Sequence, residues 1–158
     1  MENIATASRQ EVFDFVVTAL LEQGRPSVSK VVLTRPSVLY DVLDSVPFGG
    51  SCRYRSIAPE NGAVLKCGIG HLIGDVEYSS EMEGRNVLSI ASRWRSLRLR
   101  EFAEANREFI RDLQRAHDLF DSCQDPTEIT AAEWLVLFKD AAATVAGCYE
   151  LSTAVLNQ

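Results

Sequence analysis

Hydrophobic residues repeat every three or four positions near the start of the chain, which predicts an amphipathic helix. We expect this helix over residues 8–23, because Ser8 and Glu11 have the spacing of a capping box. Gly24 supplies a stop at its end, and Pro26 prevents the helix from resuming. The start of the chain is therefore expected to bury one face of a single helix.

The C-terminal half carries the same helical repeat over two long segments. The pattern over residues 86–122 is compatible with one long helix or with two helices that are separated by a break near residues 97–100. Thr130 and Glu133 repeat the capping-box pattern, and the apolar seam that follows extends to Val155. Such stripes are typical of two antiparallel helices that pack together. The residues expected in the core are Trp94, Phe102, Phe109, Leu113, Phe120, Trp134, Phe138 and Val145.

The middle of the chain has short β-branched or alternating runs between turns. Residues 28–34 predict a strand and residues 36–45 a short helix. Residues 52–56 and 63–67 flank a turn and predict an antiparallel hairpin, which helices must cover to be stable. The expected fold for residues 1–158 is therefore a single, mostly helical α+β domain. In it, a C-terminal antiparallel helical hairpin and an N-terminal helix pack on a small antiparallel β-hairpin.

Three glycines, Gly68, Gly70 and Gly74, follow the predicted hairpin. They do not form the GxGxxG pattern, and no lysine follows them as in a phosphate-binding loop. Close backbone packing or a turn is the use that the small size of glycine favours here.

Length and composition predict a globular protein. With 158 residues, 46% of them hydrophobic, the chain can bury a core without disulfides. No apolar run approaches the roughly 20 residues that a bilayer span needs, and the N-terminus lacks the pattern of a signal peptide. We therefore expect a cytoplasmic protein without membrane contact.

The charges are segregated along the chain, whose net charge is −6. Residues 71–84 hold four acids and no base, residues 85–111 hold seven arginines and three glutamates, and residues 112–158 hold eight acids and two bases. These charges can neutralise each other within the fold, or they can present faces that steer a charged protein partner. The candidate partner-binding residues are Glu77, Glu81, Glu83, Asp118, Asp121, Arg95 and Arg98.

The basic stretch from Arg93 to Arg100 also suggests a nucleic-acid site in which Trp94 stacks on a base. The net negative charge of the chain argues against this interpretation. In addition, glutamates follow at the spacing that pairs them with Arg107 and Arg111. A salt-bridged helix face is therefore favoured, and nucleic-acid binding is the weaker alternative.

Few side chains in this sequence predict catalytic or metal chemistry. Zinc could use Cys52, Cys67, His71 and either His117 or Cys123. No CxxC pair is present, so small buried cysteines without a cofactor are the favoured interpretation. A nucleophile, a base and an oxyanion donor cannot all be named, so we do not expect an enzyme.

Two groups of motifs resemble a family of small proteins that phages and prophages encode. The first group reads Cys-Arg-Tyr-Arg at residues 52–55, Lys-Cys-Gly-Ile-Gly-His-Leu-Ile-Gly-Asp at residues 66–75, then Tyr78 and Met-Glu-Gly at residues 82–84. The second group reads Leu-Gln-Arg-Ala-His-Asp at residues 113–118. The resemblance implies a phage accessory protein, and it carries over no catalytic site.

By analogy, phage accessory proteins of this size often bind and block a host protein. We therefore expect an inhibitor of a host complex, of the anti-CRISPR type, whose acidic surface occupies a basic groove. The alternatives are a small metal-binding enzyme or zinc-stabilised module, and a nucleic-acid binder. A homodimer is also an open expectation, since Leu97 and Leu99 lie among the arginines.

Overall fold

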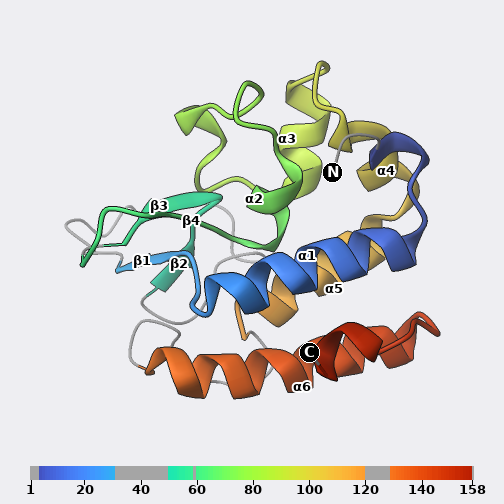
Figure 1. Ribbon diagram of the computed structural model, residues 1–158. Helices are drawn as coiled ribbons and strands as arrows, with labels where there is room; N and C mark the ends of the chain where they lie inside the picture. Colours follow the sequence, from blue (N-terminus) through green and yellow to red (C-terminus); the bar gives the residue numbers. More distant parts are fainter. Residues whose placement is uncertain (1–3, 31–49, 59, 120–128, 158) are drawn as a thin grey trace, which may run out of the picture.

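The computed structural model describes residues 4–30, 50–58, 60–119 and 129–157. Its helices are α1 (Arg9–Gln23), α2 (Gly68–Leu72), α3 (Val87–Arg93), α4 (Leu99–Ala105), α5 (Arg107–His117) and α6 (Ala131–Cys148). Its strands are β1 (Val28–Lys30), β2 (Gly50–Cys52), β3 (Arg55–Ile57) and β4 (Val64–Lys66). Short 3-10 turns are η1 (Ile4–Thr6), η2 (Ser80–Met82) and η4 (Ala154–Asn157). The fold is mostly helical α+β, as predicted (Figure 1).

The helix α1 begins and ends as its sequence predicts. The Ser8 hydroxyl accepts the amide of Glu11, and the Glu11 carboxylate returns to the Ser8 amide at 2.7 Å. Gly24 ends the helix with a left-handed φ of 69°, which glycine adopts without strain. The helix buries one face against the other elements, formed by Val12, Phe13, Val16, Val17 and Leu20.

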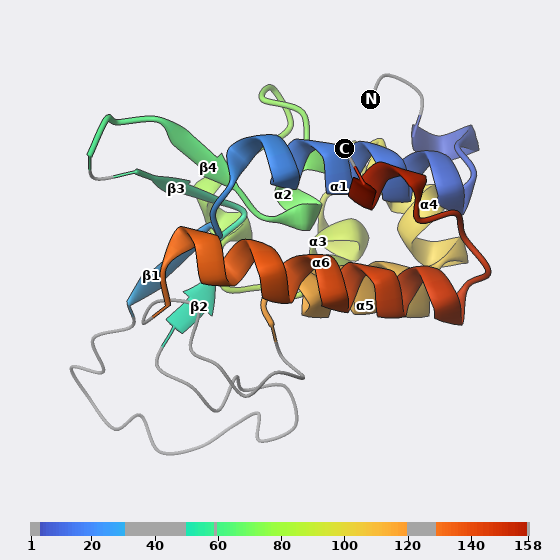
Figure 2. The same ribbon diagram turned by 60° about the horizontal axis from the view of Figure 1, so that its bottom comes forward.

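The C-terminal helical hairpin is confirmed, since α5 and α6 run antiparallel against each other (Figure 2). Thr130 caps α6 in a second capping box. The Trp134 ring stacks on Phe138, with ring centroids 4.9 Å apart and planes 2° apart. The helix ends at Cys148, before the end of the predicted seam, and Glu150 follows with a φ of 56°.

Six of the eight predicted core residues are buried: Phe102, Phe109, Leu113, Trp134, Phe138 and Val145. Trp94 is only partly buried, and Phe120 lies outside the described residues.

The segment from residue 86 forms three helices rather than one or two. Asn86 caps α3, and the helical structure is interrupted between α3 and α4 and again at Asn106. The side chain of Asn106 donates to the Phe102 carbonyl and accepts from Arg9 of α1, 2.8 Å away. This break is held by a residue 97 positions away, so the local hydrophobic pattern does not predict it.

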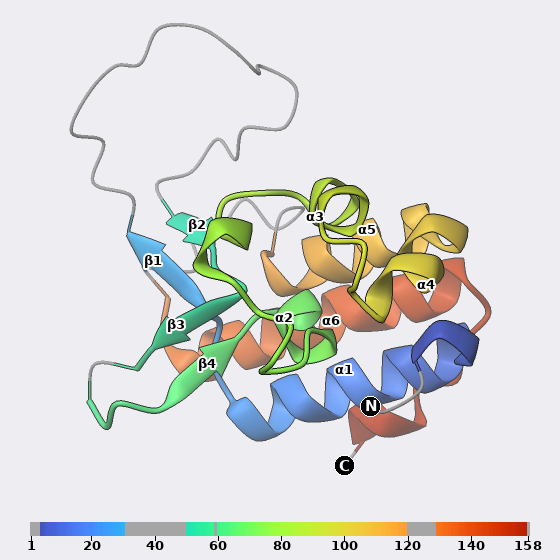
Figure 3. The ribbon, with the colours of Figure 1, turned by 90° about the horizontal axis from the view of Figure 1, so that it is seen from above.

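The β part consists of two antiparallel pairs at one end of the helices (Figure 3). Strands β3 and β4 form the predicted hairpin, with Arg55 opposite Lys66. Strand β2 instead pairs with β1, which places Val28 opposite Cys52. The helix predicted at residues 36–45 and the end of the strand predicted at residues 28–34 lie outside the described residues.

Gly70 of α2 lies directly against the backbone of Tyr54. A Cβ atom at this position would overlap the Tyr54 carbonyl oxygen and would lie 3.3 Å from Cβ of Lys66. The prediction of close backbone packing is therefore confirmed at Gly70. The contact holds α2 against the chain between β2 and β3.

Most of the buried hydrophobic side chains in the described elements join in one cluster. The longest described helix, α6, has 18 residues. No helix in the described part of the chain is both long and apolar enough to cross a membrane.

Candidate functional site

The loop between α2 and α3 carries the predicted acidic residues, and Glu77 is tied into the fold. Its carboxylate accepts the backbone amides of Gly74 at 3.0 Å and Arg98 at 2.9 Å. The Arg98 guanidinium lies 3.2 Å from the same carboxylate. Burial raises the pKa of Glu77, but the hydrogen bonds from Arg98 and Gly74 outweigh this and hold the pKa below its ordinary value. Glu77 therefore fastens the loop to the start of α4.

Glu83 fastens the other end of this loop to the strands. Its two oxygens accept the amides of Tyr54 and Arg55, each at 3.0 Å, and the Tyr78 hydroxyl at 2.8 Å. The Arg55 guanidinium lies 4.3 Å from the centre of the Tyr78 ring. Burial and the neighbouring Glu83 raise the pKa of Tyr78. Glu83 therefore has three donors within the fold.

Asp75 and Glu81 are paired as well, but nearer to solvent. Asp75 lies 2.8 Å from Arg55 and 3.0 Å from Lys66, and its hydrogen bond to Lys66 lowers its pKa. The exposed Glu81 lies 3.5 Å from Arg93, which is a weak surface contact. Asp75, Glu77 and Glu81 thus have ion-pair partners within the fold. Glu83 is held by uncharged donors instead. These contacts favour internal neutralisation, which was the first of the two alternatives.

The basic stretch contributes the other half of these contacts. Arg93 pairs with Glu81, Arg98 with Glu77, and Arg100 with Glu104 at 3.0 Å. Arg95 is exposed and lines a shallow hollow beside η1. Pairing of this stretch with carboxylates is what the salt-bridged alternative predicts.

The sequence argument for a homodimer through Leu97 and Leu99 is wrong. Leu97 is 4% exposed and Leu99 is 1% exposed, and both belong to the core cluster. The helix break before α4 turns these side chains inward between charged neighbours.

His117 and Asp118 form a structural pair. The buried His117 ring accepts the Ser27 amide at Nε2, so Nδ1 is the nitrogen that donates to Asp118, 2.7 Å away. Asp118 also accepts two hydrogen bonds from Gln114. The Trp134 indole donates to the His117 carbonyl at 3.2 Å. His117 thus joins α5 to the segment before β1, and Asp118 holds the orientation of its ring. Asp121 lies outside the described residues.

The described zinc candidates do not come together as a metal site. Cys67 caps α2 by accepting the Gly70 amide at its Sγ atom, and both ring nitrogens of His117 have partners. The side chains of Cys52 and Cys123 lie outside the described set. Among the described side chains, no three acids, cysteines or histidines cluster as metal ligands.

His71 lines a cavity of about 460 Å³ between the end of α1 and the β3–β4 hairpin. Its Nε2 atom is buried and has no hydrogen-bond partner in the described structure. Burial, with the nearby Lys66 and His117, lowers the pKa of His71 to about 4. The side chain is therefore neutral at pH 7.

His71 is expected to make the fold acid-sensitive. Between its ordinary pKa of 6.5 and about 4, the unfolded chain binds a proton that the folded chain does not, so stability falls as the pH falls through this window. We expect a loss of roughly 1–2 kcal/mol between pH 7 and pH 5, measured by urea unfolding. His71→Leu should remove most of this slope. An equally steep slope in that variant would assign the effect to other groups.

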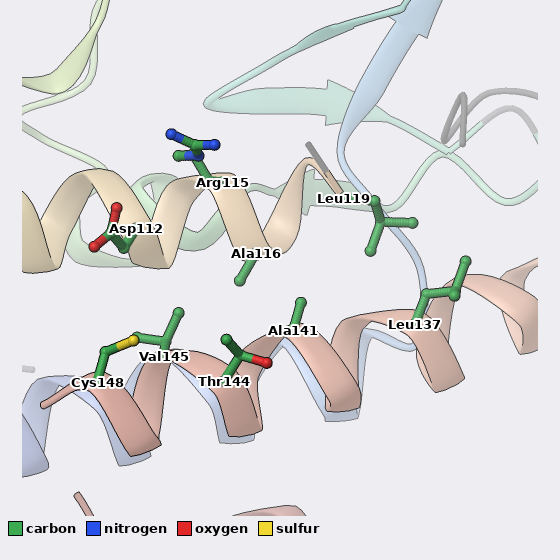
Figure 4. Close-up of a pocket in the computed structure, with 9 residues that line it drawn as sticks. All are labelled: Asp112, Arg115, Ala116, Leu119, Leu137, Ala141, Thr144, Val145 and Cys148. Atoms are coloured by element: carbon green, nitrogen blue, oxygen red, sulfur yellow. The ribbon is translucent and has the colours of Figure 1, made fainter. Parts of the chain in front are cut away.

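A groove of about 270 Å³ runs between α5 and α6 (Figure 4). The side chains of Ala116 on α5 and of Leu119, just after α5, point toward α6, and those of Ala141 and Val145 point back. Its remaining lining residues are Asp112, Arg115, Leu137, Thr144 and Cys148. Its floor is therefore apolar, and polar groups stand at its edges.

Asp112 is the acid at the edge of this groove. It accepts the Tyr149 hydroxyl at 2.8 Å and lies 3.5 Å from Arg111. Burial and the Asp112 carboxylate raise the pKa of Tyr149 to about 12. Sequence reasoning missed the groove, because its residues follow the helical repeat of a closed core. The signal was the pair of small residues, Ala116 and Ala141, that face each other across it.

Several residues of the first motif group, between residues 54 and 83, contact one another in the structure. Arg55, Lys66 and Asp75 are joined by ion pairs, and Glu83 binds Tyr78 and the backbone at Tyr54 and Arg55. Their contacts hold the strands, α2 and the acidic loop together. When the chain is compared with known proteins, no family model, no curated protein and no solved structure matches it.

Proposed function

We propose that this protein is a phage-derived accessory protein that binds a host protein complex and inhibits it. A nucleic-acid-processing defence complex, of the kind that anti-CRISPR proteins block, is the candidate target. The motif residues support a phage origin. The observation that carries the binding function is the apolar groove between α5 and α6 with Asp112 at its edge.

The size of the groove fits one anchoring side chain better than a whole ligand. Its 270 Å³ lies below the usual range of small-molecule pockets. Protein interfaces often centre on one aromatic or aliphatic anchor in such a pocket, surrounded by polar contacts. We therefore assign the groove to an apolar side chain of the partner.

Charge points to the kind of partner. The chain has a net charge of −6, and Asp112 and Glu108 lie on neighbouring turns of α5. Arg111 lies beside both carboxylates, and Arg115 also lines the groove, so the edge of the groove carries both signs of charge. Proteins that handle nucleic acids carry basic surfaces, so a partner of this class complements the overall charge of the chain.

The test is a tagged pull-down from lysate of the bacterial host with a groove-filling variant. Ala141→Trp places an indole in the groove and is expected to lower capture of the partner about thirtyfold, the loss typical of a blocked anchor site. Ala105→Trp is the matched control, because Ala105 is exposed on α4 away from the groove. Circular dichroism checks that both variants fold, and Thr144→Trp provides a second filling variant.

Support requires three results together. The captured complex must handle nucleic acid, its capture must fall at high salt, and the wild-type protein must inhibit it while Ala141→Trp does not. Equal capture by the filled and control variants would remove the groove from the proposal. If the tagged wild-type protein captured no partner, the proposed binding function itself would be overturned.

A further inference from the structure

The cavity between the end of α1 and the β3–β4 hairpin has the size of a small-molecule site. Its volume of about 460 Å³ lies within the usual range of such sites, whereas the groove between α5 and α6 lies below that range. Its lining residues belong to the last turns of α1 and the residue after Gly24, to the hairpin, and to α2, and none of them lines the groove. In Figure 3, the hairpin lies beside this end of α1. The cavity is therefore a separate candidate site.

Two residues that line this cavity carry buried polar atoms without a hydrogen-bond partner. Nε2 of His71 and Nε of Arg25 are both buried, and neither has a partner among the described residues. Buried polar atoms in folded proteins nearly always have one. A ligand in the cavity that offers matching groups would supply the partners.

Gln23, in contrast, is fully occupied within the fold and shapes the cavity wall. Its side-chain amide donates to the carbonyls of Arg25 and Lys66, and its oxygen accepts the Lys66 amide at 2.8 Å. These bonds tie the end of α1 to β4. The wall is therefore held in place before any ligand enters, which lowers the cost of binding.

Most charges around the cavity are compensated by other side chains. The Arg25 guanidinium pairs with Glu60, and Lys66 lies 3.0 Å from Asp75. Glu22 lines the cavity and is exposed, and it has no ion-pair partner in the part of the chain that the structure describes. One uncompensated carboxylate disfavours an anion as the ligand and favours a neutral molecule that offers an N–H group.

The remaining walls of the cavity are mainly apolar. They are formed by Ala19, Ala58, Ala63, Val64 and Leu65. Val64 is a large hydrophobic residue that nevertheless remains 52% exposed, so a ligand would cover apolar surface there. Apolar walls with a few polar groups fit a flat ring that carries polar atoms at its edge.

We propose that this cavity binds a neutral nitrogen heterocycle of the nucleobase class. Arg25 donates from Nε to a carbonyl or ring nitrogen of the base, and Glu22 accepts one of its N–H groups. The His71 ring is uncharged, so it offers one donor and one acceptor nitrogen. A turn about its last side-chain bond, a torsion with broad freedom, brings Nε2 to the base. This site does not depend on the groove or on the host partner.

The imidazole signals of His71 in nuclear magnetic resonance spectra test the proposal. Adenosine, guanosine, cytidine and uridine are titrated separately into the full chain. At least one should bind with a Kd below about 1 mM and shift the His71 ring signals until they saturate. His117 is the internal reference, because both of its ring nitrogens have partners in the fold, and its signals should stay in place. Acetate and inorganic phosphate, titrated in the same way, should not bind.

Three variants assign the binding to the cavity. His71→Phe keeps an aromatic ring without nitrogens, and Ala63→Trp fills the cavity, so each should lower the affinity at least about tenfold. Glu22→Ala should lower it about threefold or more, the value of one hydrogen bond. Glu101→Ala is its matched control, because Glu101 is exposed on α4 and does not line the cavity, and it should bind as the wild type does. Circular dichroism checks that every variant folds.

The proposal would be overturned if no nucleoside bound with a Kd below about 1 mM. Tighter binding of acetate or phosphate than of every nucleoside would overturn it as well, since the cavity would then be an anion site. Unchanged affinity in folded His71→Phe and Ala63→Trp would place the nucleoside elsewhere on the protein, with the same consequence.

Discussion

Replacing Gly70 with alanine is expected to destabilise the fold by at least about 3 kcal/mol, although it adds only a methyl group. The new Cβ would overlap the Tyr54 carbonyl oxygen, which is backbone and cannot rotate away. Either α2 must move off the chain between β2 and β3, or the strands must shift. Both movements open the packing around Ile69 and Leu72, which are buried.

Gly147→Ala is the matched control for this prediction. Gly147 lies on α6, where a Cβ would meet nothing within 4 Å. Alanine is the better helix former, so this variant should be as stable as the wild type or up to about 1 kcal/mol more stable. Urea unfolding of dilute protein, followed by circular dichroism, measures both variants. Equal midpoints for the two alanine variants would contradict the close backbone contact at Gly70.

The sequence predicts those parts of the fold whose contacts are local. The capping boxes at Ser8 and Thr130 join residues three positions apart, so both are visible as a pattern and both are confirmed. The hairpin of β3 and β4 is visible for the same reason, because one short turn joins its strands. Gly24 ends α1 because glycine adopts the left-handed backbone conformation without strain, and the structure confirms this prediction as well.

The sequence pattern does not predict which distant residues contact each other. Glu77 and Arg98 lie 21 positions apart, so the charge pattern could not choose between internal neutralisation and exposed faces. The helix break at Asn106 depends in part on Arg9, which lies 97 positions away. Close packing of a glycine is predicted at Gly70, but its partner, the Tyr54 carbonyl, is not. The α5–α6 groove depends on which small residues face each other, and this is set by how the two helices pack.

The residues of the first motif group have roles within the fold. Arg55, Lys66, Asp75 and Glu83 bind one another or the backbone, so their residue types are explained by folding. A motif that is explained by internal contacts gives no direction to a docking surface. The groove between α5 and α6, which has room for a side chain, is the better candidate for that surface.

Glu83→Ala is the second substitution with a large expected effect, a loss of about 3 kcal/mol. It removes the acceptor for the Tyr54 and Arg55 amides and for the Tyr78 hydroxyl. Hydrogen bonds to a charged acceptor are stronger than neutral ones, and partly buried donors left without a partner add their own cost. Thermal and urea unfolding should both show the loss. Amide exchange at Tyr54 and Arg55 would locate it in the β part.

Glu81→Ala is the matched control, two residues away in the same loop. Glu81 is exposed and makes only a 3.5 Å contact with Arg93, so its removal should cost less than about 0.5 kcal/mol. If both variants lost the same stability, the Glu83 hydrogen bonds would not be what holds the loop.

This difference decides how an acidic docking surface can be tested. Charge reversal at Glu83 or Glu77 would lower partner capture by disturbing the fold, whatever the partner touches. Glu81→Lys changes the same surface while leaving these anchors in place. Loss of capture by Glu81→Lys at an unchanged melting temperature would therefore move the docking surface from the groove to the acidic loop. Full capture by Glu81→Lys, with loss by Ala141→Trp, would keep it at α5 and α6.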